Sequence, residues 1–288
     1  MTAREPPGRS AKAIEAFLAG RPYRPVRFLG RGGMGEVWVV EHTTLGRRFA
    51  FKIQHAHVVQ FADRARVEAE IMGRIRHPHV VEIVDFWTSA DQRPCIVMEL
   101  LQGRSLWDEL LEHPRLPMQE AVQWTCQALS GLAAAHSLGV VHRDIKPENL
   151  FLHEARGLGR VLKILDFGTA RVLPTNVHAP VQPSTRTASG AMVGSPRFMS
   201  PEGARGERVD VRADIFSIGL VLYTMLVGET PFDRGSHKVD PPSRHTETEI
   251  PSDLDVAVLR ALREDPAERY QTADEFIAAL LPLSARRA

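Results

Sequence analysis

Cysteine is scarce in this sequence, because Cys95 and Cys126 are the only two among 288 residues. This number is too small for a disulfide scaffold or for a structural zinc or iron–sulfur site. Such sparing use of cysteine is typical of a protein from a reducing compartment, so we expect a cytoplasmic location.

An excess of charge of either sign is missing as well. The 36 Lys and Arg residues almost balance the 35 Asp and Glu residues, which leaves a formal net charge of +1. A broad basic field is the usual electrostatic footprint of a nucleic-acid-binding protein. We therefore expect no nucleic-acid partner.

Long hydrophobic runs are also absent. The longest nearly continuous apolar stretch covers residues 215–228 and contains Ser217 and Thr224, so it is too short to span a bilayer. The N-terminus carries Arg4, Glu5 and two prolines where a signal peptide would need an apolar segment. We expect neither a membrane segment in this chain nor export.

The hydrophobic pattern divides the chain into a part rich in strands and a part rich in helices. Short alternating runs between residues 26 and 100 predict strands, interrupted by one amphipathic helix over 62–76. After residue 102, helical periodicity predominates. This order predicts an α+β fold, with a small antiparallel sheet and one helix first and mainly helices afterwards.

A glycine-rich segment lies between two of the predicted strands. Residues 29–37 read L-G-R-G-G-M-G-E-V and contain G-x-G-x-x-G at Gly30, Gly32 and Gly35. This spacing is weak evidence, because about one chain in ten of this glycine content would show it by chance. Its place between two strands disfavours a dinucleotide-binding fold. A glycine hairpin lets backbone N–H groups approach phosphate oxygens, although a plain flexible hairpin stays an alternative.

Two polar segments further along the chain carry a more specific signal. Residues 140–150 read V-V-H-R-D-I-K-P-E-N-L, and residues 162–168 read L-K-I-L-D-F-G. The pattern H-R-D-x-K-x-x-N occurs by chance on the order of 10⁻⁷ times per starting position. With the glycine segment, these motifs resemble those of the eukaryotic-type (Hanks-type) protein Ser/Thr kinases, in particular their bacterial branch.

The resemblance implies a bilobal protein-kinase fold with ATP bound in the cleft between the lobes. Residues 1–24 would form an N-terminal extension, residues 25–101 the N-lobe and hinge, and residues 102–288 the C-lobe. A single catalytic domain would then cover residues 25–282.

The chemistry of phosphoryl transfer explains why these residue types are needed. The reaction requires the triphosphate, Mg²⁺ and the acceptor hydroxyl to be held in line while negative charge is neutralised. Asp144 can accept the proton of the acceptor hydroxyl, and Lys146 can reach the γ-phosphate. Asn149 and Asp166 supply hard oxygen ligands suited to Mg²⁺, for which Mn²⁺ can substitute. We therefore expect ATP and Mg²⁺ as cofactors.

The resemblance also implies a lysine–glutamate pair. Lys52 of A-F-K-I matches the strand lysine that holds the α- and β-phosphates and pairs with a glutamate on the following helix. Periodicity does not choose between Glu68 and Glu70, but the family's spacing to the next His-Pro favours Glu68. Glu70 would then be a solvated helix charge.

An adenine pocket is implied in the same way. Met98 would be the gatekeeper, and Glu99 through Leu101 would be the hinge that offers backbone groups to adenine. The base would be enclosed by Leu29, Val37, Ala50 and Phe151. An aliphatic residue is commoner in the family where this chain has Phe151.

The class of acceptor follows from the same resemblance. Lys146 stands where Ser/Thr-directed members of the family carry lysine. Gly194-Ser195 resembles the Gly-Thr of the substrate-facing loop, and the Ser195 hydroxyl would bridge Asp144 and Lys146. Two structural supports are also implied: an ion pair of Glu202 with Arg269, and backbone hydrogen bonds from the catalytic loop to Asp214.

Regulation is suggested by the Ser/Thr-rich segment over residues 173–200. Its resemblance to the bacterial branch points to Thr185 and Thr187 as autophosphorylation sites, and a phosphate there would bring two negative charges toward Arg143. An ordinary polar loop remains the alternative. Autophosphorylation would make another copy of the chain a partner, through a transient homodimer, beside ATP and protein substrates.

One departure from the family concerns residues 234–253. This stretch is polar and interrupted by prolines, whereas such kinases usually have an additional helix there that helps to bind protein substrates. We expect that helix to be missing or reduced to a turn. The main prediction is a protein Ser/Thr kinase with activation-loop autophosphorylation; the alternatives are an ATP-binding scaffold with weak transfer activity and a small-molecule phosphotransferase.

Overall fold

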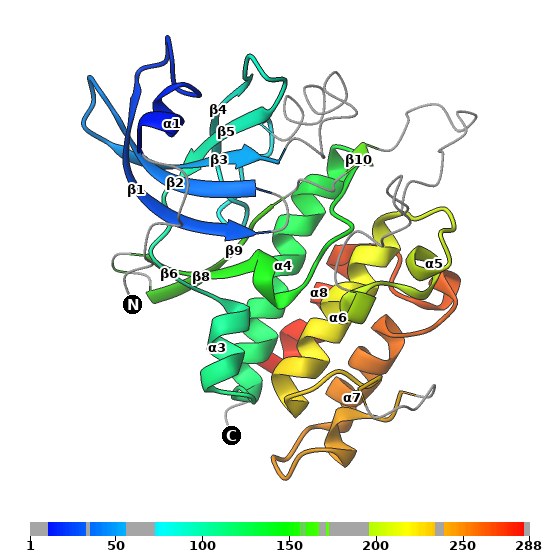
Figure 1. The fold of residues 1–288 in the computed structure, drawn as a ribbon. Helices are drawn as coiled ribbons and strands as arrows, with labels where there is room; N and C mark the ends of the chain where they lie inside the picture. Colours follow the sequence, from blue (N-terminus) through cyan, green and yellow to red (C-terminus); the bar gives the residue numbers. More distant parts are fainter. Residues whose placement is uncertain are drawn as a thin grey trace. The chain divides into compact units, whose positions relative to one another are not determined.

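The protein consists of two compact units. One contains residues 1–76 and 81–102, and the other contains residues 77–80 and 103–288. A computed structural model, drawn in Figure 1, describes residues 11–32, 35–55, 73–155, 157, 159–166, 171–172, 196–233 and 239–284.

The first unit is built on an antiparallel sheet. Its five strands follow the order β1-β2-β3-β5-β4, so neighbours in the chain are neighbours in the sheet except where β5 lies between β3 and β4. The elements are α1 (Ala11–Glu15), β1 (Tyr23–Gly32), β2 (Gly35–His42), β3 (Arg48–Gln54), β4 (Ile83–Thr88) and β5 (Pro94–Glu99).

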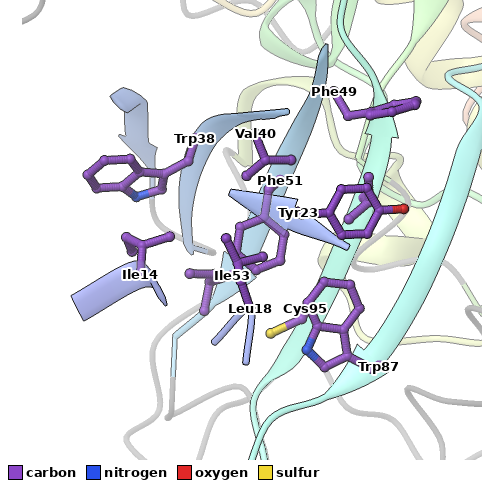
Figure 2. Close-up of a cluster of buried hydrophobic side chains, with 11 residues drawn as sticks. Ile14, Leu18, Tyr23, Trp38, Val40, Phe49, Phe51, Ile53, Trp87 and Cys95 are labelled. Atoms are coloured by element: carbon purple, nitrogen blue, oxygen red, sulfur yellow. The ribbon is translucent and has the colours of Figure 1, made fainter. Parts of the chain in front are cut away.

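One face of this sheet carries the hydrophobic core of the unit. Figure 2 shows large aromatic side chains gathered there, and the rings of Phe51 and Trp87 stack with centroids 5.3 Å apart. Ile14 and Leu18, from the segment before β1, are 0% and 3% exposed in the same cluster. Part of the expected N-terminal extension therefore belongs to the core of the first unit.

The second unit contains the helices that dominate the chain. Its helices are α3 (Leu106–Glu112), α4 (Met118–Ser137), α5 (Pro201–Ala204), α6 (Val211–Val227), α7 (Ser252–Ala261) and α8 (Ala273–Ser284). Its 3₁₀ turns are η2 (Pro147–Asn149), η4 (Pro196–Phe198), η5 (Pro242–Arg244) and η6 (Pro266–Glu268). Its short strands are β6 (Gly103–Ser105), β7 (Val140–Val141), β8 (Leu150–Ala155), β9 (Gly159–Ile164) and β10 (Arg171–Val172).

Helix α6 is the centre of this unit, because nearly all of its residues are buried. Its interior hydroxyls are satisfied within the helix: Ser217 donates to the Ala213 carbonyl and Thr224 to the Leu220 carbonyl. A β-carbon on Gly219 would come within 2.9 Å of the Ala261 side chain on α7, so glycine permits close packing of the two helices. α4 and α7 also contact α6, as Figure 1 shows.

The predicted loss of a helix between 234 and 253 is confirmed for the part that the structure describes. Over residues 239–251 the only regular element is the turn η5, which is followed directly by α7. Ser243 donates hydrogen bonds from its backbone and its hydroxyl to Asp255 and so fastens the turn to α7. Among the described helices, none is long and apolar enough to cross a membrane.

Candidate active site

Strand register brings four of the predicted nucleotide-binding residues to one face of the first unit. Val37 is paired with Lys52, and Ala50 is paired with Met98. Cross-strand partners point to the same face, as do residues two apart on β3. This face lies opposite the one that carries Phe51, so the strands separate the predicted nucleotide residues from the core.

Leu29 joins that face through an irregularity in β1. The pairing shifts between Phe28, opposite Trp38, and Gly30, opposite Val37. Phe28 packs against the core cluster, so Leu29 is turned toward the other side of the sheet.

The three glycines of the motif have different structural requirements. A β-carbon on Gly35 would lie 2.2 Å from the Ile53 carbonyl oxygen, which real structures do not tolerate. At Gly30 and Gly32 an added β-carbon would meet no described atom within 4 Å. Gly35 is therefore needed for packing β2 against β3, whereas Gly30 and Gly32 leave space next to the sheet.

This difference predicts that alanine substitutions at the three glycines affect different properties of the protein. We expect Gly35→Ala to lower the free energy of unfolding by about 1–3 kcal/mol, because its β-carbon collides with backbone. Gly30→Ala and Gly32→Ala should change stability by less than about 0.5 kcal/mol but weaken ATP binding, because a methyl group obstructs the approach of phosphate to the backbone. Thermal unfolding and ATP titration of the three variants test this. Wild-type stability of Gly35→Ala would contradict the packing argument.

The expected hinge continues β5. The Glu99 N–H donates to the Glu82 carbonyl at 3.0 Å, and the Glu82 N–H donates to the Glu99 carboxylate at 2.9 Å. The N–H and the carboxylate of Glu99 thus both fasten the end of β5 to Glu82. Met98 is in β5, and Leu101 follows the strand with a half-buried side chain.

In the second unit, the segment around η2 brings three predicted catalytic residues together. The Lys146 ammonium donates to both carboxylate oxygens of Asp144, at 3.0 and 2.9 Å. The Asn149 amide nitrogen donates to the Asp144 backbone carbonyl at 2.7 Å and to its Oδ2 at 3.0 Å. The Asp144 carboxylate is therefore oriented by a cation on one side and an amide on the other.

Asp214, in the first turn of α6, anchors this loop. Its carboxylate accepts the backbone N–H groups of His142 at 2.9 Å and Arg143 at 2.8 Å, as the sequence predicted. Its Oδ2 also lies 2.8 Å from the His136 Nε2 of α4. Three hydrogen bonds thus compensate the cost of burying this carboxylate, since Asp214 is 0% exposed.

The electrostatic balance at Asp214 favours the ionised form. Burial alone would raise the pKa of this carboxyl group. The hydrogen bond with His136, the charge of His136 and the Arg143 N–H outweigh burial, so the pKa lies below its ordinary value. Asp214 is therefore a stable acceptor for the catalytic-loop backbone.

His142 connects the loop to the end of β9. Its Nδ1 accepts the Asp144 N–H at 3.3 Å, so the ring proton is on Nε2, which lies 2.9 Å from the Leu165 carbonyl. Arg143 and Asp166 have positive φ angles of 67° and 52°, which are uncommon for residues other than glycine. Such strained residues persist where the surroundings hold them, as the Asp214 hydrogen bond does for Arg143.

The residues predicted to hold Mg²⁺ fit a hard cation. The amide nitrogen of Asn149 is committed to Asp144, which leaves its Oδ1 as the atom for a metal. The Asn149 carbonyl accepts the Leu165 N–H at 2.8 Å and so ties η2 to the residue before Asp166. Phe151, which is expected to help enclose adenine, lies half-buried in β8 opposite Ser105 and Lys163.

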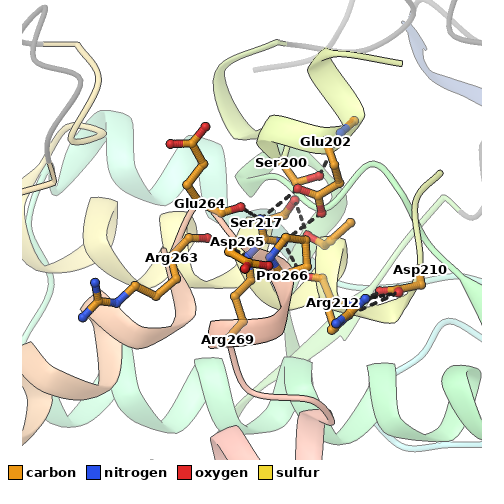
Figure 3. Close-up of polar contacts among 12 residues, drawn as sticks. Ser200, Glu202, Asp210, Arg212, Ser217, Arg263, Glu264, Asp265, Pro266 and Arg269 are labelled. Carbon is orange, nitrogen blue, oxygen red and sulfur yellow. Dashed lines mark hydrogen bonds and ion pairs between the residues drawn. The ribbon is translucent and has the colours of Figure 1, made fainter. Parts of the chain in front are cut away.

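The predicted ion pair of Glu202 and Arg269 is confirmed and deeply buried (Figure 3). Two guanidinium nitrogens of Arg269 each lie 2.8 Å from a Glu202 oxygen. The other donors reach the backbone carbonyls of Arg263, Arg212 and Glu264. The guanidinium also lies over the Phe216 ring, 4.7 Å from its centroid.

Several predicted residues lie outside the described part of the chain: Glu68 and Glu70, Thr185, Thr187 and Ser195. Sequence reasoning missed His136 and the bridging role of the His142 ring. The position of His136 in the last turn of α4, two residues before Leu138-Gly139, was the available signal.

Comparison with known proteins decides the family. The profile described as "Protein kinase domain" matches residues 23–286. The chain belongs to the protein kinase family. The predicted resemblance and the α+β kinase fold are thereby confirmed.

Curated relatives of this kinase domain include bacterial serine/threonine-protein kinases. Serine/threonine-protein kinase pkn2 of Myxococcus xanthus is 38% identical over 279 residues, which cover 91% of this chain and 32% of that protein. PknB of Mycobacterium leprae is 35% identical over 270 residues, which cover 88% of this chain and 41% of that protein. The chain therefore spans about a third to two fifths of these curated relatives' length.

A solved structure supports the fold. The kinase domain of PknI from Mycobacterium tuberculosis has a TM-score of 0.70 and 26% sequence identity to this chain. The match covers 91% of this chain and 95% of that structure.

Proposed function

We propose that this kinase domain transfers the γ-phosphate of ATP to Ser and Thr hydroxyls of proteins. The observation that carries the proposal is the orientation of the Asp144 carboxylate by Lys146 and Asn149, on a loop anchored to Asp214. The names of the bacterial relatives, which are serine/threonine-protein kinases, support the class of acceptor.

In the reaction, Asp144 accepts the proton of the acceptor hydroxyl as its oxygen attacks phosphorus. Lys146, held on the same carboxylate, neutralises charge on the transferred group. Asp214 and His142 keep the loop backbone in its strained conformation, so little reorganisation is needed when substrates bind.

In this proposal, the nucleotide is held by residues of the first unit. Lys52 binds the α- and β-phosphates, the backbone at Gly30 and Gly32 covers the phosphates, and Glu99 with Leu101 binds adenine. Asn149 and Asp166 would hold Mg²⁺, which supplies charge neutralisation between the phosphate groups when bound. Glu68 is proposed as the partner of Lys52.

We further propose that the kinase modifies itself at Thr185 and Thr187, in trans between two copies. The cytoplasm is proposed as its location, because both cysteines are free thiols: Cys95 is buried and Cys126 half-buried. Burial raises the pKa of Cys95 to about 12 and that of Cys126 to about 11, so neither is a reactive thiolate.

Phosphosite mapping of the chain after incubation with Mg·ATP tests these proposals. We expect phosphate on Thr185 or Thr187 in the wild type and none in Lys52→Met, because methionine cannot bind the α- and β-phosphates. Circular dichroism checks that Lys52→Met is folded. Measurable ATP binding without phosphate in the wild type would favour the alternative of an ATP-binding scaffold.

A further inference from the structure

Arg93, directly before β5, is a buried cation of the first unit. It is 3% exposed, whereas arginine is seldom fully buried in proteins. Ser89 fixes the backbone at this point: its hydroxyl accepts the Arg93 N–H at 3.0 Å, and its N–H donates to the Arg93 carbonyl at 2.9 Å. The Arg93 side chain therefore starts from a firmly held position in the turn between β4 and β5.

The guanidinium of Arg93 connects two distant segments. Its Nε donates to the Gln54 carbonyl at the end of β3, at 2.6 Å. Its central carbon lies 4.9 Å from the centroid of the Phe17 ring, in the segment before β1. A nitrogen also lies 3.9 Å from Asp91, but that carboxylate is 55% exposed and contributes little. Arg93 thus links the segment before β1 to the end of β3.

The segment that carries Phe17 is itself anchored. Ile14 and Leu18 are buried on the aromatic face of the sheet, as Figure 2 shows. The indole N–H of Trp87 donates to the Phe17 carbonyl at 3.1 Å. The match to the protein kinase profile begins at residue 23, so Phe17 lies before the matched region. Arg93 therefore rests against a fixed ring from a segment that the family profile does not cover.

The end of β3 is close to the residues proposed to meet phosphate. Gln54 follows Lys52 by two residues and is paired with Gly35 of the glycine-rich hairpin. The next residue, His55, has its Nε2 3.2 Å from the Gly32 carbonyl oxygen. A displacement of the Gln54 carbonyl would therefore move both the strand that carries the lysine and the contact with the hairpin.

We propose that Arg93 is a positioning residue for the phosphates of the nucleotide: held against Phe17, its guanidinium fixes the Gln54 carbonyl and, through β3, Lys52. This inference rests on the proposed function, which places the phosphates at Lys52. Ala50, which is expected to enclose adenine, precedes Gln54 by four residues, or about 13 Å along a strand. Loss of the Arg93 contact should therefore weaken binding of the phosphates and leave binding of adenine unchanged.

Equilibrium titrations of the variant Arg93→Lys with Mg·ATP and with adenosine test the proposal. Lysine keeps the positive charge but has a methylene group where arginine has Nε, so the hydrogen bond to Gln54 is lost. We expect the Kd for ATP to rise about fivefold, with the Kd for adenosine within about twofold of the wild-type value. Phe17→Leu removes the ring but keeps an apolar side chain, and it should raise the Kd for ATP about twofold.

Arg21→Lys is the matched control. The Arg21 guanidinium also lies 4.9 Å from a ring centroid, that of Trp87, in the same core. Within the part of the chain that the structure describes, it makes no hydrogen bond to β3. The same substitution there should leave the Kd for ATP unchanged. Thermal unfolding of each variant shows that the protein measured is folded.

Three results would overturn the inference: an unchanged Kd for ATP in Arg93→Lys, an equal rise in its Kd for adenosine, or the same rise for ATP in Arg21→Lys. If Arg93→Lys does not fold, Phe17→Leu decides, because wild-type affinity for ATP in that variant would contradict the role of the ring. A wild type that binds ATP without transferring phosphate would overturn the proposed function alone. A wild type that does not bind ATP would overturn both.

Discussion

Asp144→Asn is expected to lower the rate of phosphoryl transfer by about 10²–10⁴-fold, the usual contribution of a positioned general base. Asparagine has the same shape and can still accept hydrogen bonds from Lys146 and Asn149, but it cannot take the proton of the acceptor hydroxyl. The backbone carbonyl bonded to Asn149 is retained, so the loop should keep its fold. Initial rates, ATP titration and thermal unfolding measured on one preparation separate catalysis from binding and stability.

Glu154→Gln is the control for Asp144→Asn. Glu154 is an exposed carboxylate of β8, opposite Arg160 in β9, so the same chemical change there should leave the rate unchanged. If Asp144→Asn kept its rate within tenfold of wild type, proton acceptance would not limit the reaction. Charge neutralisation by Lys146 and the metal would then account for most of the acceleration.

Arg269→Ala should be the most destabilising single change, with a loss of about 3–5 kcal/mol in the free energy of unfolding. It leaves the Glu202 carboxylate, 5% exposed, without its counter-charge. It also leaves three backbone carbonyls without the guanidinium donors that now reach them. Chemical denaturation of the wild type and the variant measures the loss.

Arg269→Lys tests the same argument if the alanine variant does not fold. Lysine keeps the charge, but one ammonium cannot serve both Glu202 oxygens and the carbonyls together, so most of the loss should remain. Arg205→Lys, at an exposed pair, should change stability by less than about 0.5 kcal/mol. Equal stability of both lysine variants would show that charge alone matters at Arg269.

The effect of Arg269→Ala should depend on pH. Burial alone would raise the pKa of Glu202, but hydrogen bonding and the charge of Arg269 hold it below its ordinary value of 4.5. A lowered pKa stabilises the fold above the ordinary value, and the stabilisation disappears as pH falls through the folded pKa. The difference in stability between wild type and variant should therefore narrow in acid.

The sequence was most informative where several residues form one motif. H-R-D-x-K-x-x-N led to Asp144, Lys146 and Asn149, which the structure brings into contact. The pairing of Glu202 with Arg269 and the anchoring of the catalytic loop by Asp214 were also predicted, because their motifs identify both members.

Features that depend on tertiary packing could not be predicted. His136 was missed because its position in the last turn of a helix does not identify the group that it meets, which is the buried Asp214 carboxylate of α6. The requirement for Gly35 was read only as access for phosphate, since its contact with the Ile53 carbonyl depends on strand register. Within the apolar patch at Ile14–Leu18, Ile14 and Leu18 are buried because they pack on the aromatic face of the sheet, which the local sequence does not reveal.

Strand β3 illustrates what two-sided burial means for variation. After Arg48, every residue of the strand from Phe49 to Gln54 is buried, with alternate side chains directed to the aromatic core and to the nucleotide face. We therefore expect no neutral substitution at these six positions. Half of the side chains are constrained by packing of the core and the other half by binding of the proposed nucleotide. A saturation library over β3 should therefore contain few active variants. Variants that fold but do not bind the nucleotide should carry their substitutions at every second position of the strand.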